Sequence, residues 1–313
     1  MKKTVLALAV IVLSVSAEDK VEQAAAAYDR GDYPQAARIY RQACDSGDML
    51  GCNNLAILYF QGQGVKQSDT KGSRLLARAC DGGWADACTN LAFVYEKKKN
   101  PRHDVHRAVT LYKQACVLGD AVGCGYLADR TAEGRGIKQD LFQAVLLYRQ
   151  ACDGGYFRAC NDLGAAYTHG RGIAKNDTIA FNIYTIACEH GDDMGCTNLG
   201  FAYTAGEGVD PDPFKAAALY RRACDHGNAP ACYNLGLACI SGNGVKQDEP
   251  RAITLFNRAC DGRDAMGCNI LGDAYVSGQM GVTPAPATAK AYYKKACDLG
   301  FEPGCEGYRG SKE

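Results

Sequence analysis

The segment CNDLGAAYTHGRGI, residues 160–173, is one copy of a pattern that recurs along most of this 313-residue chain. Counted from the cysteine that begins each copy, leucine occupies position +3, glycine or alanine +4 and, in five copies, tyrosine +7. Spacings of three, four and seven residues place these side chains on one face of an α-helix. The small residue at +4 is expected to let neighbouring backbone approach closely. A Gly-x-Gly-Val or Gly-x-Gly-Ile segment then ends the helix, because glycine adopts the left-handed conformation at low cost.

A second helix precedes each cysteine pair. Counted backward from the first cysteine, alanine occupies −8 and −1 and tyrosine or phenylalanine −4, as in Ala180, Tyr184 and Ala187. Asp or Asn near the start suits a helix N-terminus, as at Asp177. The chain is therefore predicted to be all-α, an α-solenoid forming one domain over 18–313. The predicted helix pairs cover 20–46, 50–82, 85–118, 121–154, 157–190, 193–226, 229–262 and 265–299, with a short capping helix near 302–309.

The cysteines repeat with the same period. Sixteen of the 17 form C-x7-C pairs, and successive pairs are 36 residues apart, except for a last step of 37. One cysteine falls in the last turn of a second helix and its partner in the first turn of the next helix. Helix ends joined by a tight turn bring Cα atoms to about 5.5 Å, which suits a disulfide. Each nine-residue loop would contribute about 2.5 kcal/mol in the chain-entropy model. The predicted disulfides, one per repeat, are Cys44–Cys52, Cys80–Cys88, Cys116–Cys124, Cys152–Cys160, Cys188–Cys196, Cys224–Cys232, Cys260–Cys268 and Cys297–Cys305.

The remaining cysteine, Cys239, is predicted to be a free thiol. It stands at +7, where other copies carry tyrosine. One interpretation is a small apolar side chain that fills the core, and the other is a reactive thiol, which would need exposure and a depressed pKa. The cysteine spacing does not match a zinc site, so no metal or other cofactor is predicted.

The N-terminus predicts export. Lys2 and Lys3 precede an apolar run that ends in Val15-Ser16-Ala17. This is typical of a signal peptide, residues 1–17, cleaved after about Ala17, and the apolar run is too short for a membrane anchor. The protein is therefore expected to be secreted or periplasmic, with no membrane attachment. The 35 Lys and Arg residues balance the 35 Asp and Glu residues, so no nucleic-acid partner is predicted.

These motifs resemble Sel1-like repeats, and with a cysteine pair in every repeat and a signal peptide the chain resembles the Helicobacter cysteine-rich proteins. The resemblance covers about residues 20–310. It implies a right-handed superhelix similar to TPR-like arrays, protein or peptide binding in the superhelical groove, interaction with host immunity, and penicillin binding with slow β-lactam hydrolysis. Two loops depart from the pattern: Lys97-Lys98-Lys99-Asn100-Pro101 replaces one Gly-x-Gly-Val turn, and the last repeat carries one extra residue around Met280.

Catalytic candidates are sparse. Serine β-lactamases use a Ser-x-x-Lys motif with two supporting elements. This chain has Ser68 and Lys71 in that spacing but neither supporting element, and Ser68 is equally explained as a helix cap. His103 and His106 are the nearest approach to a metal-ligand pair and lack further ligands nearby.

A binding face has better support. Position +2 lies away from the Leu/Tyr stripe and should line the concave side of the solenoid. Amides there can bond both N–H and C=O of an extended peptide, although local capping of the backbone is the alternative. Nearby positions +6 and +9 vary, as at Lys97, Arg130, Glu133 and His169. The candidate binding residues are Asn54, Asn90, Asp162, Asn198 and Asn234, with Tyr126 and Ile270 as exceptions.

The sequence thus predicts a monomer that binds an extended ligand in its groove. The ligand would be a host or bacterial protein or a peptidoglycan peptide. Because penicillins mimic the end of peptidoglycan stem peptides, weak β-lactam binding or hydrolysis could accompany this role. A β-lactamase as the main activity is the alternative.

Overall fold

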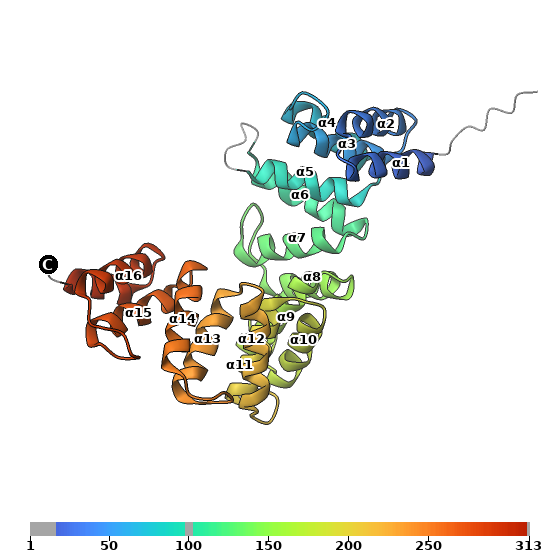
Figure 1. The fold of residues 1–313 in the computed structure, drawn as a ribbon. Helices are drawn as coiled ribbons and strands as arrows, with labels where there is room; N and C mark the ends of the chain where they lie inside the picture. Colours follow the sequence, from blue (N-terminus) through green and yellow to red (C-terminus); the bar gives the residue numbers. More distant parts are fainter. Residues whose placement is uncertain (1–16, 98–102, 312–313) are drawn as a thin grey trace, which may run out of the picture. The chain divides into compact units, whose positions relative to one another are not determined.

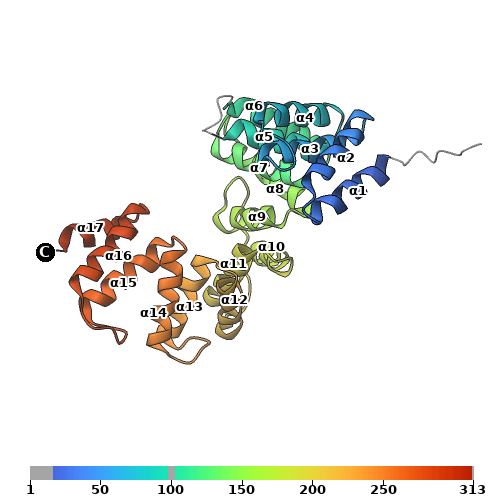
Figure 2. The ribbon, with the colours of Figure 1, turned by 45° about the horizontal axis from the view of Figure 1, so that its top comes forward.

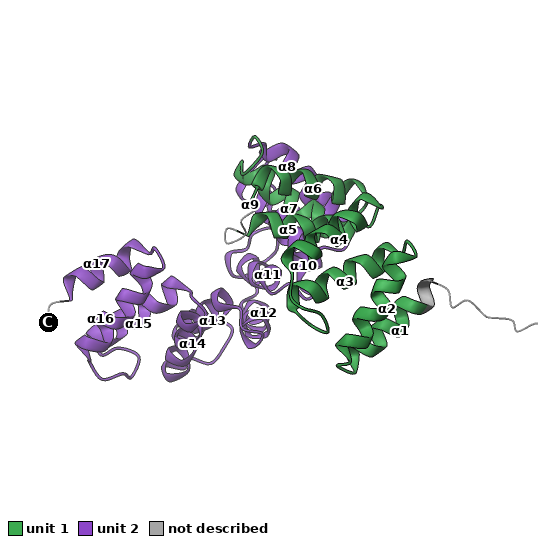
Figure 3. Cartoon of the chain, turned by 90° about the horizontal axis from the view of Figure 1, so that it is seen from above, with its two compact units in different colours: residues 1–138 green, residues 139–313 purple. Residues whose placement is uncertain are grey.

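The computed structural model describes residues 17–97 and 103–311 (Figure 1). Most of the predicted signal peptide therefore lies outside the described residues. The chain divides into two compact units, residues 1–138 and 139–313 (Figure 3). The boundary falls between the two helices of the fourth predicted pair. A single domain over 18–313 stays a prediction.

All regular structure in the described ranges is helical, and the helices follow one another in pairs within each unit (Figure 2). The all-α solenoid prediction is confirmed. The short α17 occupies the place expected for a C-terminal capping helix. None of the helices in these ranges is long and apolar enough to cross a bilayer. The first unit contains α1 (Ala17–Asp29), α2 (Tyr33–Asp45), α3 (Met49–Gln61), α4 (Asp69–Asp81), α5 (Ala85–Glu96), α6 (Val105–Val117) and α7 (Ala121–Glu133). The second contains α8 (Leu141–Asp153), α9 (Phe157–His169), α10 (Asp177–Glu189), α11 (Asp193–Ala205), α12 (Pro213–Asp225), α13 (Ala229–Ser241), α14 (Glu249–Asp261), α15 (Ala265–Ser277), α16 (Pro286–Asp298) and α17 (Glu302–Gly310).

Polar caps and turn glycines set the helix ends, and the cap of α10 is Asn176, one residue before the Asp177 that the pattern indicated. Asp48 caps α3 by accepting the Gly51 N–H, and Asn176 caps α10 by accepting the Ile179 N–H. At the other end of α3, Gly62 has φ 70°, a conformation that costs a residue with a Cβ extra energy. Short connections of this kind keep consecutive helices antiparallel neighbours.

The small residue at +4 meets an aromatic ring where it is glycine. A Cβ added to Gly200 would lie 2.7 Å from Cε1 of Tyr220, the residue at −4 of the second helix in the same repeat. The expectation that neighbouring backbone would approach here was therefore wrong. The ring needs the space because its Cδ1, Cε1 and Cζ atoms lie directly against the helix. The same contact is made by Gly164 with Tyr184, Gly236 with Phe256 and Gly272 with Tyr293.

One disulfide joins each repeat to the next, as predicted. The eight bonded pairs are those expected, with Cα–Cα separations of 4.4–4.7 Å. These separations are shorter than the expected value because a glycine or alanine precedes the second cysteine of each pair. At Gly195, for example, an added Cβ would lie 2.5 Å from the Cβ of Ala187. The small residue lets the two helix ends touch.

Cys239 is the free cysteine, and its side chain is fully buried. Burial raises the pKa of its thiol, which opposes formation of the reactive thiolate. Its environment is that of a small apolar side chain in the core of the second unit.

Candidate functional site

The Ser-x-x-Lys motif forms a helix cap. Ser68 precedes α4, and its Oγ accepts the backbone N–H of Lys71 at 3.3 Å. The Lys71 ammonium lies 5.4 Å from the centroid of the Tyr59 ring, on the exposed side of the repeat. The lysine therefore does not approach the hydroxyl as a base would, and the pair stabilises the start of α4.

The histidines of the sequence do not assemble a metal site. His106 Nδ1 lies 2.9 Å from the carbonyl oxygen of Gly136, 30 residues further along the chain, and this contact orients the ring. Within residues 17–97 and 103–311, no three His, Cys, Asp or Glu side chains are grouped so that they could hold a metal ion.

The +2 asparagines take part in hydrogen bonds between repeats. Asn90 Nδ2 donates to Oδ1 of Asn53 at 3.0 Å, and Asn53 Nδ2 donates to Oδ1 of its neighbour Asn54 at 3.1 Å. Asn53, at +1, is 5% exposed. Three amides thus link α3 to α5, while the cap of α3 is Asp48.

The same chain recurs in the second unit. Asn198 Nδ2 donates to Oδ1 of Asn161 at 2.7 Å, and Asn161 Nδ2 donates to Oδ1 of Asp162 at 3.4 Å. Asn234, by contrast, forms no hydrogen bond within the described residues, because the +1 residue before it in the array is Thr197. That hydroxyl instead lies 2.7 Å from the carbonyl oxygen of Asp193 and 3.2 Å from Oδ1 of Asn228, the cap of α13. The ladder is therefore built in pairs of repeats.

Three of the +2 side chains line pockets of the same construction. Each pocket is formed by the end of one first helix, by the second helix after it, and by positions +2, +5 and +6 of the next first helix. Asn90 lines a wide pocket of about 660 Å³ in the first unit. Asn198 and Asn234 line pockets of about 190 and 220 Å³ in the second unit. We call this repeated surface the +2/+5 face.

Position +5 is the part of this face that the sequence reasoning missed. Phe201 is 50% exposed and lines both the pocket of Asn198 and that of Asn234, so these two pockets are adjacent. Leu237 occupies the same place one repeat later and is 37% exposed. Phe93 is the equivalent residue in the first unit. The detectable signal was an apolar residue that recurs beside, and outside, the buried Leu/Tyr stripe.

The variable positions divide between the pockets and the interior. Lys97 lines the pocket of Asn90, and His169 lines that of Asn198. Arg130, however, is turned inward and is only 9% exposed. Its guanidinium pairs with Glu96 and Glu133, so it was wrongly expected on the variable binding surface. An arginine at +6 is drawn inward because Glu96 offers it a carboxylate from the preceding repeat.

An aromatic cluster accompanies this ion pair. Tyr126, which replaces the +2 asparagine, stacks on Tyr112 with ring centroids 5.5 Å apart and meets Phe93 edge to face at 4.6 Å. The Tyr112 hydroxyl donates to Glu96 Oε2 at 3.0 Å. The polar ladder is therefore replaced here by packed rings and one buried carboxylate.

The electrostatics of the cluster favour the charged carboxylate. Burial acts to raise the pKa of Glu96, but the hydrogen bonds and charge of Arg130, with the hydrogen bond from Tyr112, outweigh it and hold that pKa below its usual range. Burial and the neighbouring Glu96 charge raise the pKa of Tyr112. The group is thus a structural ion pair with a tyrosine donor rather than a set of proton-transfer residues.

Comparison with known proteins agrees with this architecture. A segment of 43 residues is 44% identical to the Helicobacter pylori protein named "Putative beta-lactamase HcpC", covering 14% of this chain and 15% of that protein. Among solved structures, the protective antigen c5321 of uropathogenic Escherichia coli superposes with a TM-score of 0.74 at 25% identity, over 94% of this chain and 64% of that one. A Sel1 repeat protein from Oxalobacter formigenes superposes with a TM-score of 0.71 at 27% identity, over 77% of this chain and 99% of that one.

The family model for the Sel1 repeat matches nearly the whole described chain. The matched residues are 24–48, 50–84, 85–120, 121–156, 157–192, 193–228, 229–264 and 265–301. These segments coincide with the helix pairs and with the period of the disulfides. The chain belongs to the Sel1 repeat family.

Proposed function

We propose that this protein binds an extended peptide along the +2/+5 face of its first helices. The observation that carries the proposal is the pair of adjacent pockets in the second unit, which share Phe201 and present Asn198 and Asn234 at equivalent places. A ligand that occupies both pockets must be extended, and it must present similar chemical groups at regular intervals along its length. A polypeptide has both properties.

The groups on this face suit a peptide backbone. A carboxamide offers both a donor and an acceptor, so it can bond the N–H and the C=O of one residue. Asn234 has both functions unused within the described chain, while Asn198 keeps its carbonyl after donating to Asn161. The exposed rings and aliphatic chains at +5 would contact the side chains of the ligand.

The setting limits the partners. Eight disulfides indicate an oxidising environment outside the cytoplasm. The partners proposed are accordingly host or bacterial proteins and peptidoglycan peptides, bound by a secreted or periplasmic monomer. The signal peptide that would export the protein remains a prediction from residues 1–17.

Binding of labelled decapeptide pools and of muropeptides, followed by fluorescence polarisation, tests the proposal. Asn234→Ala should raise the Kd of a bound peptide about three- to tenfold, because one or two hydrogen bonds are lost. The melting temperature should not change. Asn182→Ala, at an exposed position of α10 outside the pockets, is the matched control. The proposal fails if no pool binds, or if Asn234→Ala binds as tightly as the control.

The alternative function, β-lactam hydrolysis, draws its support from the name of HcpC and from the local resemblance to it. The cap formed by Ser68 gives that alternative no activated nucleophile at the one Ser-x-x-Lys motif. Slow turnover without a dedicated nucleophile would still be compatible with a β-lactam held as a peptide mimic on the +2/+5 face.

A further inference from the structure

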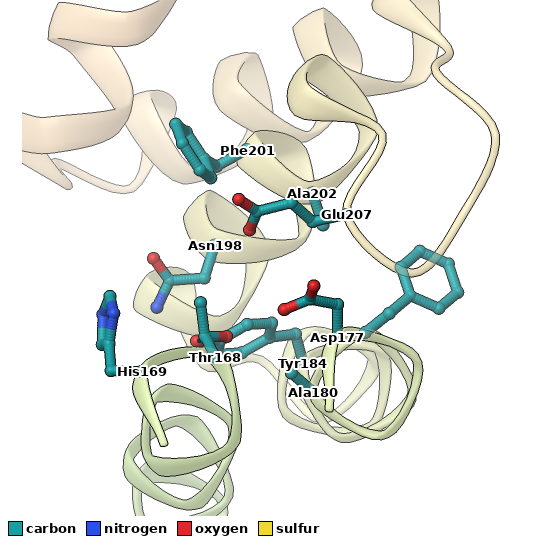
Figure 4. A pocket seen from close by; sticks show the side chains of 10 residues that line it. Thr168, His169, Asp177, Ala180, Tyr184, Asn198, Phe201, Ala202 and Glu207 are labelled. Carbon is teal, nitrogen blue, oxygen red and sulfur yellow. Dashed lines mark hydrogen bonds between the residues drawn. The ribbon is translucent and has the colours of Figure 1, made fainter. Parts of the chain in front are cut away.

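The pocket of Asn198 differs from its neighbour by its charge. It is formed by Thr168 and His169 at the end of α9, by the first two turns of α10, by α11, and by Glu207 just beyond α11. In Figure 4 the carboxylates of Asp177 and Glu207 turn toward the same space, with the amide of Asn198 beside them. The two acids come from different repeats, so their meeting is a property of the repeat junction.

These carboxylates are poorly satisfied by the chain itself. Asp177 Oδ1 is shielded from solvent and has no hydrogen bond within the described residues. It forms an ion pair with Lys175, whose Nζ lies 3.4 Å from that oxygen on a side chain that is 55% exposed. Glu207 forms no ion pair in the described part of the protein. Because an ion pair with an exposed lysine is weak, a ligand donor in good hydrogen-bond geometry would still gain free energy at this oxygen.

Aromatic side chains complete the walls. Tyr184, Phe181 and Phe201 line the same pocket. Burial raises the pKa of the Tyr184 hydroxyl, and the negative charges of Glu207 and Asp162 raise it further, although the hydrogen bond with Thr168 opposes them. Asp177 and Glu207 both line the pocket, whereas Lys175, which pairs with Asp177, is not among its lining residues. Carboxylates together with ring faces are the environment that ammonium and guanidinium groups prefer.

The next pocket shows that the fold does not require this charge. One repeat later, Pro213 stands where Asp177 stands, and Asn243 where Glu207 stands. Ala217 and Leu237 likewise replace Phe181 and Phe201. The second pocket is built by equivalent positions and has no charged residue in its lining.

We propose that the pocket lined by Asp177 and Glu207 takes the charged end of a lysine or arginine side chain of the bound peptide, while the pocket lined by Asn234 takes an uncharged side chain. This inference rests on the proposed function, because it gives the register of a peptide on the +2/+5 face. It deepens that function by naming the ligand as a peptide with a basic residue in one pocket and an uncharged residue in the adjacent one.

The test uses positional-scanning pools of fluorescein-labelled decapeptides in which one position is fixed as Lys, Arg, norleucine or Glu. Binding is measured at pH 8, so that imidazole groups are uncharged, and at 0.05 M and 0.5 M NaCl. At one position, the Lys and Arg pools should bind the oxidised full chain about tenfold more tightly than the norleucine pool, or about 1.4 kcal/mol. The Glu pool should bind more weakly still. High salt should reduce these differences, because the pocket is open to solvent on one side.

The double variant Asp177→Asn/Glu207→Gln should abolish the preference for the Lys and Arg pools over the norleucine pool. Glu249→Gln is the matched control, because Glu249 begins α14 as Asp177 begins α10 and does not line either pocket. Circular dichroism of each variant verifies that it is folded.

Three results would overturn the inference in distinguishable ways. If pools bind but none prefers Lys or Arg, or if the preference survives in the double variant, the cationic pocket is wrong and peptide binding stands. If the preference falls equally in Glu249→Gln, it reflects overall charge rather than this pocket. If no pool binds at all, the proposed function fails and takes the inference with it.

Discussion

Removing Arg130 alone should lower the unfolding free energy far more than removing both Arg130 and its partner Glu96. The side chains of Arg130 and Glu96 are 11% and 12% exposed, and two hydrogen bonds join them, of which Nη2 to Oε2 measures 3.2 Å. In Arg130→Ala, Glu96 would keep its charge in this buried site with only Tyr112 as a donor. Leaving such a charge unpaired costs about 3–5 kcal/mol of unfolding free energy.

The second unit supplies the matched control. There, Thr168 and Thr204 stand at the position of Glu96 and bond the tyrosines that correspond to Tyr112, at 3.2 and 3.1 Å. The residues that correspond to Arg130 are alanines. Glu96→Thr/Arg130→Ala therefore copies an arrangement that the protein already uses. It should be within about 1 kcal/mol of the wild type, because no charge is left buried.

Urea unfolding followed by the fluorescence of Trp84, the only tryptophan of the chain, reports on this region because Trp84 immediately precedes α5. Glu96 has a lowered pKa in the folded protein, so its stabilising contribution is complete above the usual carboxyl range and is lost as pH falls through the folded-state pKa. In Arg130→Ala burial is no longer outweighed by Arg130, so the pKa of the same carboxyl should rise and the group should gain a proton on folding as pH falls. The difference in free energy of unfolding between wild type and Arg130→Ala should therefore become smaller from pH 7 to pH 4. A loss below about 1 kcal/mol in Arg130→Ala, or an equal loss in the double variant, would refute the reasoning.

Three further outcomes are expected. Alkylation followed by intact-mass measurement should label no cysteine in the native protein and one, Cys239, in denaturant without reductant, whereas three or more labels would contradict the disulfide pairing. Ser68→Ala should cost about 1 kcal/mol through loss of the cap of α4 and should leave unchanged any nitrocefin turnover that exceeds a heat-denatured control. Turnover that disappears with the hydroxyl would instead assign Ser68 a catalytic role. Gly200→Ala should destabilise by about 1–3 kcal/mol because its Cβ would meet the Tyr220 ring. Adding Tyr220→Leu, which copies the Ala56 and Leu76 combination of another repeat, should recover part of that loss, and a Gly200→Ala variant more stable than wild type would disprove the packing argument.

The fold could be predicted because its information is local and periodic. The cysteine spacing, the Leu/Tyr stripe and the turn glycines each concern residues within one 36-residue unit. The contact partner at +4 was mistaken because periodicity identifies a close approach without identifying the atoms that make it. Gly200 shows this, since a flat ring rather than a backbone fills the space.

The candidate site could be predicted only in part, for a related reason. Position +2 was found because Asn recurs there, but its bond to Asn53 or Asn161 joins residues 37 apart. That pairing depends on how far one repeat is displaced along the next, and no periodicity encodes the displacement. The shared role of Phe201 in two pockets and the inward turn of Arg130 depend on the same offset.

The disulfides have a consequence for how such a chain can change in length. The two cysteines of every bonded pair are eight positions apart in the sequence, and each bond lies where one repeat ends and the next begins. Duplicating or deleting one whole repeat therefore leaves every cysteine with a bonding partner. Protein lineages built in this way can lengthen or shorten their binding surface one pocket at a time without redesigning their oxidative folding.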